Sequence, residues 1–152
     1  QDEVKMQYSM AQRGRTYIIR LEHGEIIHES IENFAKDKKV EAGFLIILGG
    51  ADQGSKLVVG PENENSEQIS PMHYVLDNVH EITGTGTLFP DEKGQPKLHM
   101  HISAGRKGSA VTGCIREGVR TWTILEVILI ELVNTKALRK RDSTTGFELL
   151  QL

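Results

Sequence analysis

Residues 97–114, KLHMHISAGRKGSAVTGC, contain the pattern that decides the fold. In the first half of this stretch apolar and polar residues alternate, which is typical of a β-strand with one buried face. The second half alternates in the same way, and the glycine-rich segment AGRKG between the two halves is typical of a turn. The stretch therefore predicts a β-hairpin with one apolar face and one polar face.

The polar face of this hairpin carries three candidate metal ligands, His99, His101 and Cys114. A symmetric hairpin would place His99 opposite Cys114, with Cβ atoms about 4.5–5.5 Å apart, and His101 opposite Thr112. Two imidazoles and a thiolate favour zinc or a similar divalent transition metal, with a fourth position left open. The alternative is three ordinary polar residues of a sheet, since a lone cysteine is usually a small buried hydrophobe.

Two further residues, His80 and Glu126, could take part in a metal site. His80 is a possible fourth ligand or outer hydrogen-bond partner if its strand lies beside the hairpin. Glu126 and Glu131 interrupt the apolar run TILEVILIEL, where a carboxylate is costly unless it is paired or ligated. For Glu131 we expect an exposed sheet edge. For Glu126 the polar site, a subunit interface and an exposed edge remain equally open.

The rest of the chain predicts one helix among strands. Residues 24–39, GEIIHESIENFAKDKK, have the apolar spacing of an amphipathic helix. The apolar run 42–51 predicts a strand buried on both faces, and residues 73–89 predict one long strand or a bent pair. Residues 134–146 predict a basic surface loop. These elements predict an α+β fold, an antiparallel and partly curled sheet with one main flanking helix, in a single domain at 12–152 after an N-terminal extension at 1–11.

Composition limits the functional classes. The 152 residues have a net charge of −3, which does not fit a protein held on nucleic acid by its overall charge. Local contacts to phosphates could come from basic residues of two loops, namely Arg106, Lys107, Arg139 and Arg141. The alternative for each loop is a solvated basic surface, which is common in a net-acidic chain. A single cysteine forbids an internal disulfide and fits a reducing compartment. We see no signal peptide and no apolar run of membrane-spanning length, and expect a cytoplasmic protein that does not enter a membrane.

The order of the motifs resembles the plants and prokaryotes conserved (PPC) domain in its free-standing prokaryotic form. The resemblance runs from about residue 12 to residue 152 and is carried by YIIRLEHGEIIHESIENFA, GTGTL, PKLHMHIS, EVILIEL and TGFELL. It implies an antiparallel sheet with a flanking helix, assembled as a homotrimer. Plant members carry separate AT-hooks and bind AT-rich DNA, and free-standing prokaryotic members are often labelled DNA-binding by that association. This chain lacks the hooks.

The resemblance also bears on the metal site. Many prokaryotic members have a His-x-His pair followed by Gly-Gly-His-Leu, and those three histidines resemble metal ligands. His99 and His101 match the first pair, and Cys114 stands where the third histidine would be, in the segment Thr-Gly-Cys-Ile. The resemblance therefore implies a DNA-binding or regulatory homotrimer with a zinc-type site. The alternative is a small metal-dependent enzyme or small-molecule-binding protein of unknown substrate, and whether the chain is an enzyme stays open.

Overall fold

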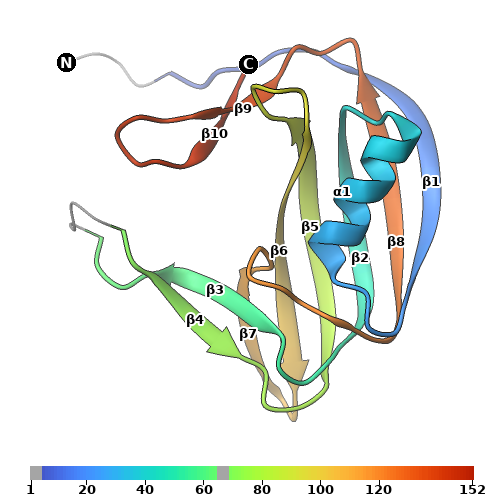
Figure 1. The fold of residues 1–152 in the computed structure, drawn as a ribbon, viewed down its shortest axis with the longest axis vertical. Coiled ribbons are helices and arrows are strands. Elements are labelled where there is room, and N and C mark those ends of the chain that lie inside the picture. The colour runs from blue at the N-terminus through green and yellow to red at the C-terminus, as the bar shows by residue number, and fades with distance from the viewer. Residues whose placement is uncertain (1–4, 65–68) are drawn as a thin grey trace.

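The computed structural model describes residues 5–64 and 69–152. Within these ranges it contains one helix and ten strands, drawn in Figure 1, with the bounds α1 Ile27–Lys38, β1 Gln12–Glu22, β2 Ala42–Ala51, β3 Lys56–Pro61, β4 Pro71–Val75, β5 His80–Pro90, β6 Pro96–Arg106, β7 Ser109–Cys114, β8 Thr121–Val133, β9 Leu138–Arg141 and β10 Glu148–Gln151. Eight strands form one sheet in the order β1-β8-β2-β5-β6-β7-β3-β4, and β9 and β10 pair as a separate hairpin. Every pairing between these strands is antiparallel, which confirms the predicted α+β fold.

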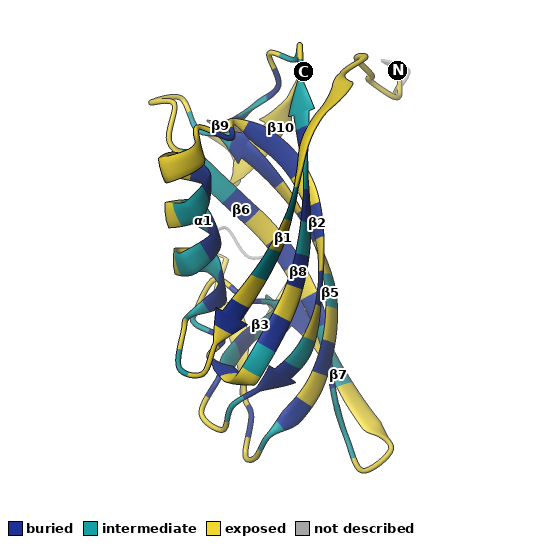
Figure 2. Cartoon of the chain, turned by 90° about the vertical axis from the view of Figure 1, so that its right-hand side faces the viewer, coloured by how far each residue is buried: buried dark blue, intermediate teal, exposed yellow. Residues whose placement is uncertain are grey.

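The core lies between α1 and one face of the sheet. Figure 2 shows α1 on one side of the curved sheet, and along the strands buried and exposed residues alternate. On β2, Leu45 and Ile47 are buried under the helix, whereas Phe44, Ile46 and Leu48 point to the other face and are exposed. The prediction that β2 is buried on both faces is therefore wrong, because within the described residues a single helix covers only one side. We call the opposite side, which α1 does not cover, the outer face.

The predicted hairpin is present, but its register differs from the symmetric one by two residues. His101 pairs with Cys114 rather than with Thr112, and the strands continue to the pair Arg106 and Ser109. The turn is consequently only two residues long, and both of them, Lys107 and Gly108, have positive φ, as a type I′ turn requires. A shift of two residues leaves every side chain on its original face, since strand alternation has a period of two.

The segment predicted as one long strand or a bent pair is a pair of strands, β4 and β5. β5 lies between β2 and β6, the strand that carries the two histidines. A Cβ atom at Gly84 would lie 2.7 Å from the backbone oxygen of His101 and 3.0 Å from Ile47. The glycine thus allows close packing against β6, as expected for glycine within a strand.

The predicted basic loop at 134–146 is wrong in part, because it contains the strand β9. Arg139 on this strand is 6% exposed and donates hydrogen bonds to backbone oxygens of β5 and β6. These long-range contacts hold the C-terminal hairpin against the sheet. No helix in the described part of the chain is long and apolar enough to span a membrane.

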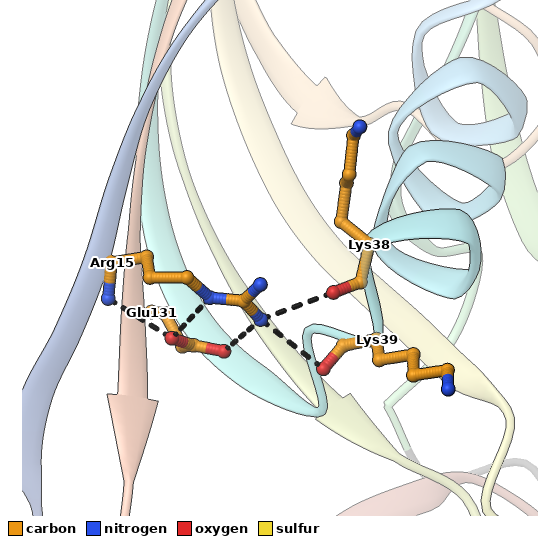
Figure 3. A network of polar contacts seen from close by, with 4 residues as sticks. All are labelled: Arg15, Lys38, Lys39 and Glu131. Carbon is orange, nitrogen blue, oxygen red and sulfur yellow. Dashed lines mark hydrogen bonds and ion pairs between the residues drawn. The ribbon is translucent and has the colours of Figure 1, made fainter.

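Glu131 is not at an exposed edge, as we had predicted, but is 7% exposed and paired with Arg15 on β1. Figure 3 shows that the guanidinium donates to both carboxylate oxygens, with Nη2 2.7 Å from Oε2 and Nε 3.0 Å from Oε1. The backbone N–H of Arg15 also donates to Oε1, next to an irregularity in the β1–β8 pairing. Nη2 reaches the carbonyl of Lys38 at 3.0 Å, so the pair joins two strands to the end of α1.

This pair predicts a loss of stability in acid. The hydrogen bond from Arg15 holds the pKa of Glu131 below its usual value, so the stabilisation is present above the unfolded-state pKa of about 4.3 and is lost as the pH falls through the lower folded-state value. We expect Glu131→Gln to lower the urea midpoint at pH 7 and to make it less dependent on pH between pH 5 and pH 3. Glu126→Gln, an exposed change on the same strand, is the control. Equal pH dependence in the wild type and Glu131→Gln would contradict the expectation.

Candidate functional site

His99, His101 and Cys114 lie on the outer face of the sheet. His99 pairs with Thr87 and His101 with Thr85, both exposed residues of β5. Cys114 is directly opposite His101 on β7, and directly paired residues share a face. The alternation in the sequence therefore placed all three on the correct common face, although it gave Cys114 the wrong partner.

The two imidazoles have the spacing of two ligands of one ion. Their Nε2 atoms are 3.2 Å apart, and their ring planes are 82° to each other. Two nitrogens at a zinc–nitrogen distance of about 2.0–2.1 Å on a tetrahedral ion would be roughly 3.3 Å apart. Burial, with a smaller contribution from His101, lowers the pKa of His99. A lowered pKa keeps the ring neutral, which is the form that binds a metal.

Cys114 is less well placed as a third metal ligand than the two histidines are. The thiol is free and half-buried. Among residues 5–64 and 69–152, no group of three or more His, Cys, Asp or Glu side chains is close enough to hold one metal ion. Cys114 lies directly opposite His101. A rotation about the χ1 angle of Cys114 would move the sulfur without any change in the backbone. The donor types fit a zinc-type ion, and the thiol position is the part that would have to adjust.

The two predicted supporting residues are not near the histidines. His80 is the first residue of β5, five positions from the partner of His101, or about 16 Å along the strand. Its Nδ1 is 2.8 Å from the carbonyl oxygen of Asn78. Glu126 lies on β8, three strands away from β6, or about 14 Å. It is exposed on the outer face between Arg20 and Leu48.

A pocket of about 790 Å³ adjoins the histidines. It lies between the outer face of β6, β7 and β3 and the C-terminal hairpin, and its walls include His99, His101 and Cys114. Because β7 ends at Cys114, the carbonyl of Leu98 on β6 lacks a strand partner, and Arg116 donates to it. Arg116 also pairs with Glu32 of α1 at 2.5 Å. We call the pocket that His99, His101 and Cys114 line the histidine pocket.

The predicted nucleic-acid contacts do not form one surface. Arg106 and Lys107 lie at the β6–β7 turn and Arg139 and Arg141 on β9, and Figure 1 places the turn and this strand at opposite ends of the molecule. Arg106 donates to the carbonyl of Val79 at 2.9 Å. Arg139 is buried and Arg106 is half-buried, so only Lys107 and Arg141 of these four residues are exposed.

We did not identify Arg116 from the sequence as a residue of the histidine pocket. We also did not predict that Arg139 is buried. Alternation places Arg116 on the same face as Cys114, so a local signal for it existed. For Arg139 the sequence has no local signal, since its burial depends on contacts with Thr87 and Lys97, 52 and 42 residues away.

Comparison with known proteins identifies relatives of the chain by sequence similarity. It is 27% identical over 135 residues to a bifunctional protein GlmU from a Synechococcus species, covering 88% of this chain but only 20% of that protein. The chain thus spans about a fifth of the length of the curated relatives that it matches.

Solved structures show the same fold. A plant- and prokaryote-conserved protein from Pyrococcus horikoshii is 26% identical, with a TM-score of 0.79 over 97% of this chain and 100% of that one. A metal-containing protein from Archaeoglobus fulgidus is 21% identical, with a TM-score of 0.81 over 97% and 100%. A candidate DNA-binding protein from Bacteroides thetaiotaomicron is 20% identical, with a TM-score of 0.73 over 94% and 98%.

The family profile that matches this sequence covers residues 8–133, from the residues before β1 to the end of β8. It therefore includes the helix, the main sheet and the strands that carry the two histidines and the cysteine. The chain belongs to the Plants and Prokaryotes Conserved domain family, abbreviated PPC or PCC.

Proposed function

We propose that this chain is a metal-dependent protein that binds a small molecule. In this proposal His99, His101 and Cys114 hold zinc or a similar divalent transition metal at the wall of the histidine pocket. The observation that carries the proposal is the 3.2 Å separation of the two Nε2 atoms, because it matches the spacing of two ligands on one ion. A bound metal would supply a Lewis-acidic coordination position for the ligand. We propose binding rather than catalysis, since we identify no general base beside the histidines among residues 5–64 and 69–152.

Titration with Co²⁺ tests this site directly. A thiolate bound to Co²⁺ gives an intense charge-transfer absorption that imidazole and water ligands do not give. We expect one Co²⁺ per chain with this band in the wild type. In Cys114→Ser we expect the band to be absent and the affinity to be at least about tenfold lower, because a soft anionic ligand is replaced by a neutral oxygen. Cobalt binding with an identical spectrum in Cys114→Ser would exclude the cysteine, and no binding by the wild type would exclude the site.

We propose further that the chain assembles as a homotrimer through the outer face. Large apolar side chains of β1 and β2 are exposed there, with Ile18 87%, Ile46 48%, Leu48 50% and Phe44 42% exposed. A contiguous apolar surface of this kind is characteristic of an interaction site. The number three comes from the family resemblance. The histidine pair lies on the same face, two strands from β2.

DNA binding is the second candidate function. It is favoured by two solved neighbours, from Bacteroides thetaiotaomicron and Ralstonia eutropha, that are described as candidate DNA-binding proteins. The net charge of −3 and the separation of the basic residues count against it. A DNA affinity that falls steeply as salt concentration rises would favour this function. For either function we propose a reducing, cytoplasmic location, which the single free cysteine supports.

A further inference from the structure

We infer that the histidine pocket binds an amphipathic organic anion, with its carboxylate or phosphate group on Arg139 and its apolar part between β3 and the C-terminal hairpin. The inference deepens the proposed function, since it names the chemical class of the small molecule. It rests on a different part of the pocket from the metal ligands, so the two can be tested separately.

Arg139 is a buried cation that has hydrogen bonds but no ion pair. Its exposed fraction is 6%, and it forms no ion pair with a carboxylate in the part of the chain that the structure describes. A buried charge is costly unless it is paired, and removing a cation from water needs compensation by an anion or by several hydrogen bonds. Hydrogen bonds to Lys97 and Thr87 supply part of that compensation, and a bound oxyanion would supply the opposite charge.

The surroundings of Arg139 fix the guanidinium and leave one nitrogen available. Nε donates to the carbonyl of Lys97 at 3.2 Å, and Nη2 donates to the carbonyl and hydroxyl of Thr87 at 2.9 and 3.0 Å. The group also lies over the ring of Phe89, 5.4 Å from its centre. Nη1 has no acceptor among the described residues, and Arg139 lines the pocket. A guanidinium held in this way can give its remaining N–H groups to a carboxylate or phosphate.

The charge of the pocket also favours an anion. Three lining side chains, Lys97, Arg116 and Arg139, are cationic, and Glu148 is the one anionic residue among those that line it. Arg116 is paired with Glu32 of α1, so Lys97 and Arg139 are the two lining cations without an ion pair among the described residues. Burial, followed by the positive charge of Arg116, lowers the pKa of Arg139, and the carboxylates of Glu148 and Glu32 offset part of this effect. The two guanidiniums therefore repel one another. An anion between them would relieve this repulsion.

The remaining walls predict an apolar body for the ligand. Val58 and Val59 of β3 form one side, and Phe147 and Leu149 of the C-terminal hairpin form the other. Phe147 is 50% and Leu149 48% exposed, so both have apolar surface that a ligand could cover. A volume of about 790 Å³ lies within the range of about 300–1,000 Å³ that is usual for small-molecule sites.

Calorimetric titration with octanoate, monooctyl phosphate and octan-1-ol tests the inference. It is carried out on chelator-treated protein and repeated on zinc-loaded protein. We expect at least one of the two anions to bind chelator-treated protein with one site per chain, and octan-1-ol to bind at least about tenfold more weakly, since it lacks the charge-assisted hydrogen bonds. The tighter anion identifies the head group. Equal binding of the alcohol, or binding of neither anion, would overturn the inference.

Variants of Arg139 and Arg116 test whether the anion binds in the histidine pocket. Arg139→Gln is expected to weaken binding of the tighter anion by about 10- to 100-fold, because a hydrogen bond to a charged group is lost. Arg141→Gln, the same change at an exposed position of the same strand, should leave binding unchanged. Because Arg139 also holds backbone oxygens, its variant is checked by thermal unfolding, and Arg116→Gln provides a second variant with an expected loss of about 3- to 10-fold. Wild-type anion affinity in both variants would overturn the inference.

The metal proposal and the anion inference fail in different ways. A protein that binds the anion without metal but never binds Co²⁺ would refute the metal site and leave the anion site in place. A protein that binds Co²⁺ but neither anion, with or without zinc, would refute the anion site alone.

Discussion

A variant with His99→Ala and His101→Ala is expected to lose its metal. The two imidazoles are already at ligand spacing, with their Nε2 atoms 3.2 Å apart. Loss of a partner outside the ligand set typically costs 10- to 100-fold in metal affinity, so removal of two ligands should cost more than about 100-fold. Elemental analysis of the purified variant and Co²⁺ titration measure the loss.

The matched control removes two imidazoles elsewhere. His23→Ala with His73→Ala has the same change in composition, but these residues lie on the β1–α1 connection and on β4. The control should keep one metal per chain. If the His99 and His101 variant kept the wild-type metal content, the ion would be bound at another place.

Ile46→Glu is expected to convert the assembly into single chains. Ile46 is 48% exposed at the middle of β2 and lies between Ile128 and Thr85 on the neighbouring strands. Within an interface a carboxylate at this position would lose its hydration without gaining a cation, which costs several kcal/mol. We therefore expect light scattering to give the mass of three chains for the wild type and of one chain for the variant.

The control for this prediction is Val75→Glu, an apolar-to-acidic change at a position of β4 that is 52% exposed. It should remain trimeric. A wild-type mass of one chain at micromolar concentration, or a trimeric Ile46→Glu, would contradict assembly through the outer face.

Local patterns predicted most of the elements. Alternation identified β1, β6 and β7, and the spacing of apolar residues identified α1, because these signals depend only on neighbouring residues. The error in the hairpin register is instructive. Lys107 and Gly108 are suited to a two-residue turn, whereas the prediction treated the whole segment AGRKG as the turn. The shift of two residues therefore changed the partner of Cys114 without changing its face.

Features that depend on distant contacts could not be predicted in this way. Glu131 and Arg15 are 116 residues apart, and neither strand shows locally that the other lies beside it. The exposure of Phe44 and Ile46 depends on how many helices cover the sheet. The apolar run of β2 contains no information about that number. The same holds for Arg139, whose burial is set by β5 and β6.

Anomalous X-ray scattering at the zinc edge, from crystals grown without added metal, tests the metal site most directly. The account predicts one peak per chain, about 2.0–2.1 Å from the Nε2 atoms of His99 and His101 and about 2.3 Å from the sulfur of Cys114. A thiol turned away from both rings, with no peak between the imidazoles, would contradict it.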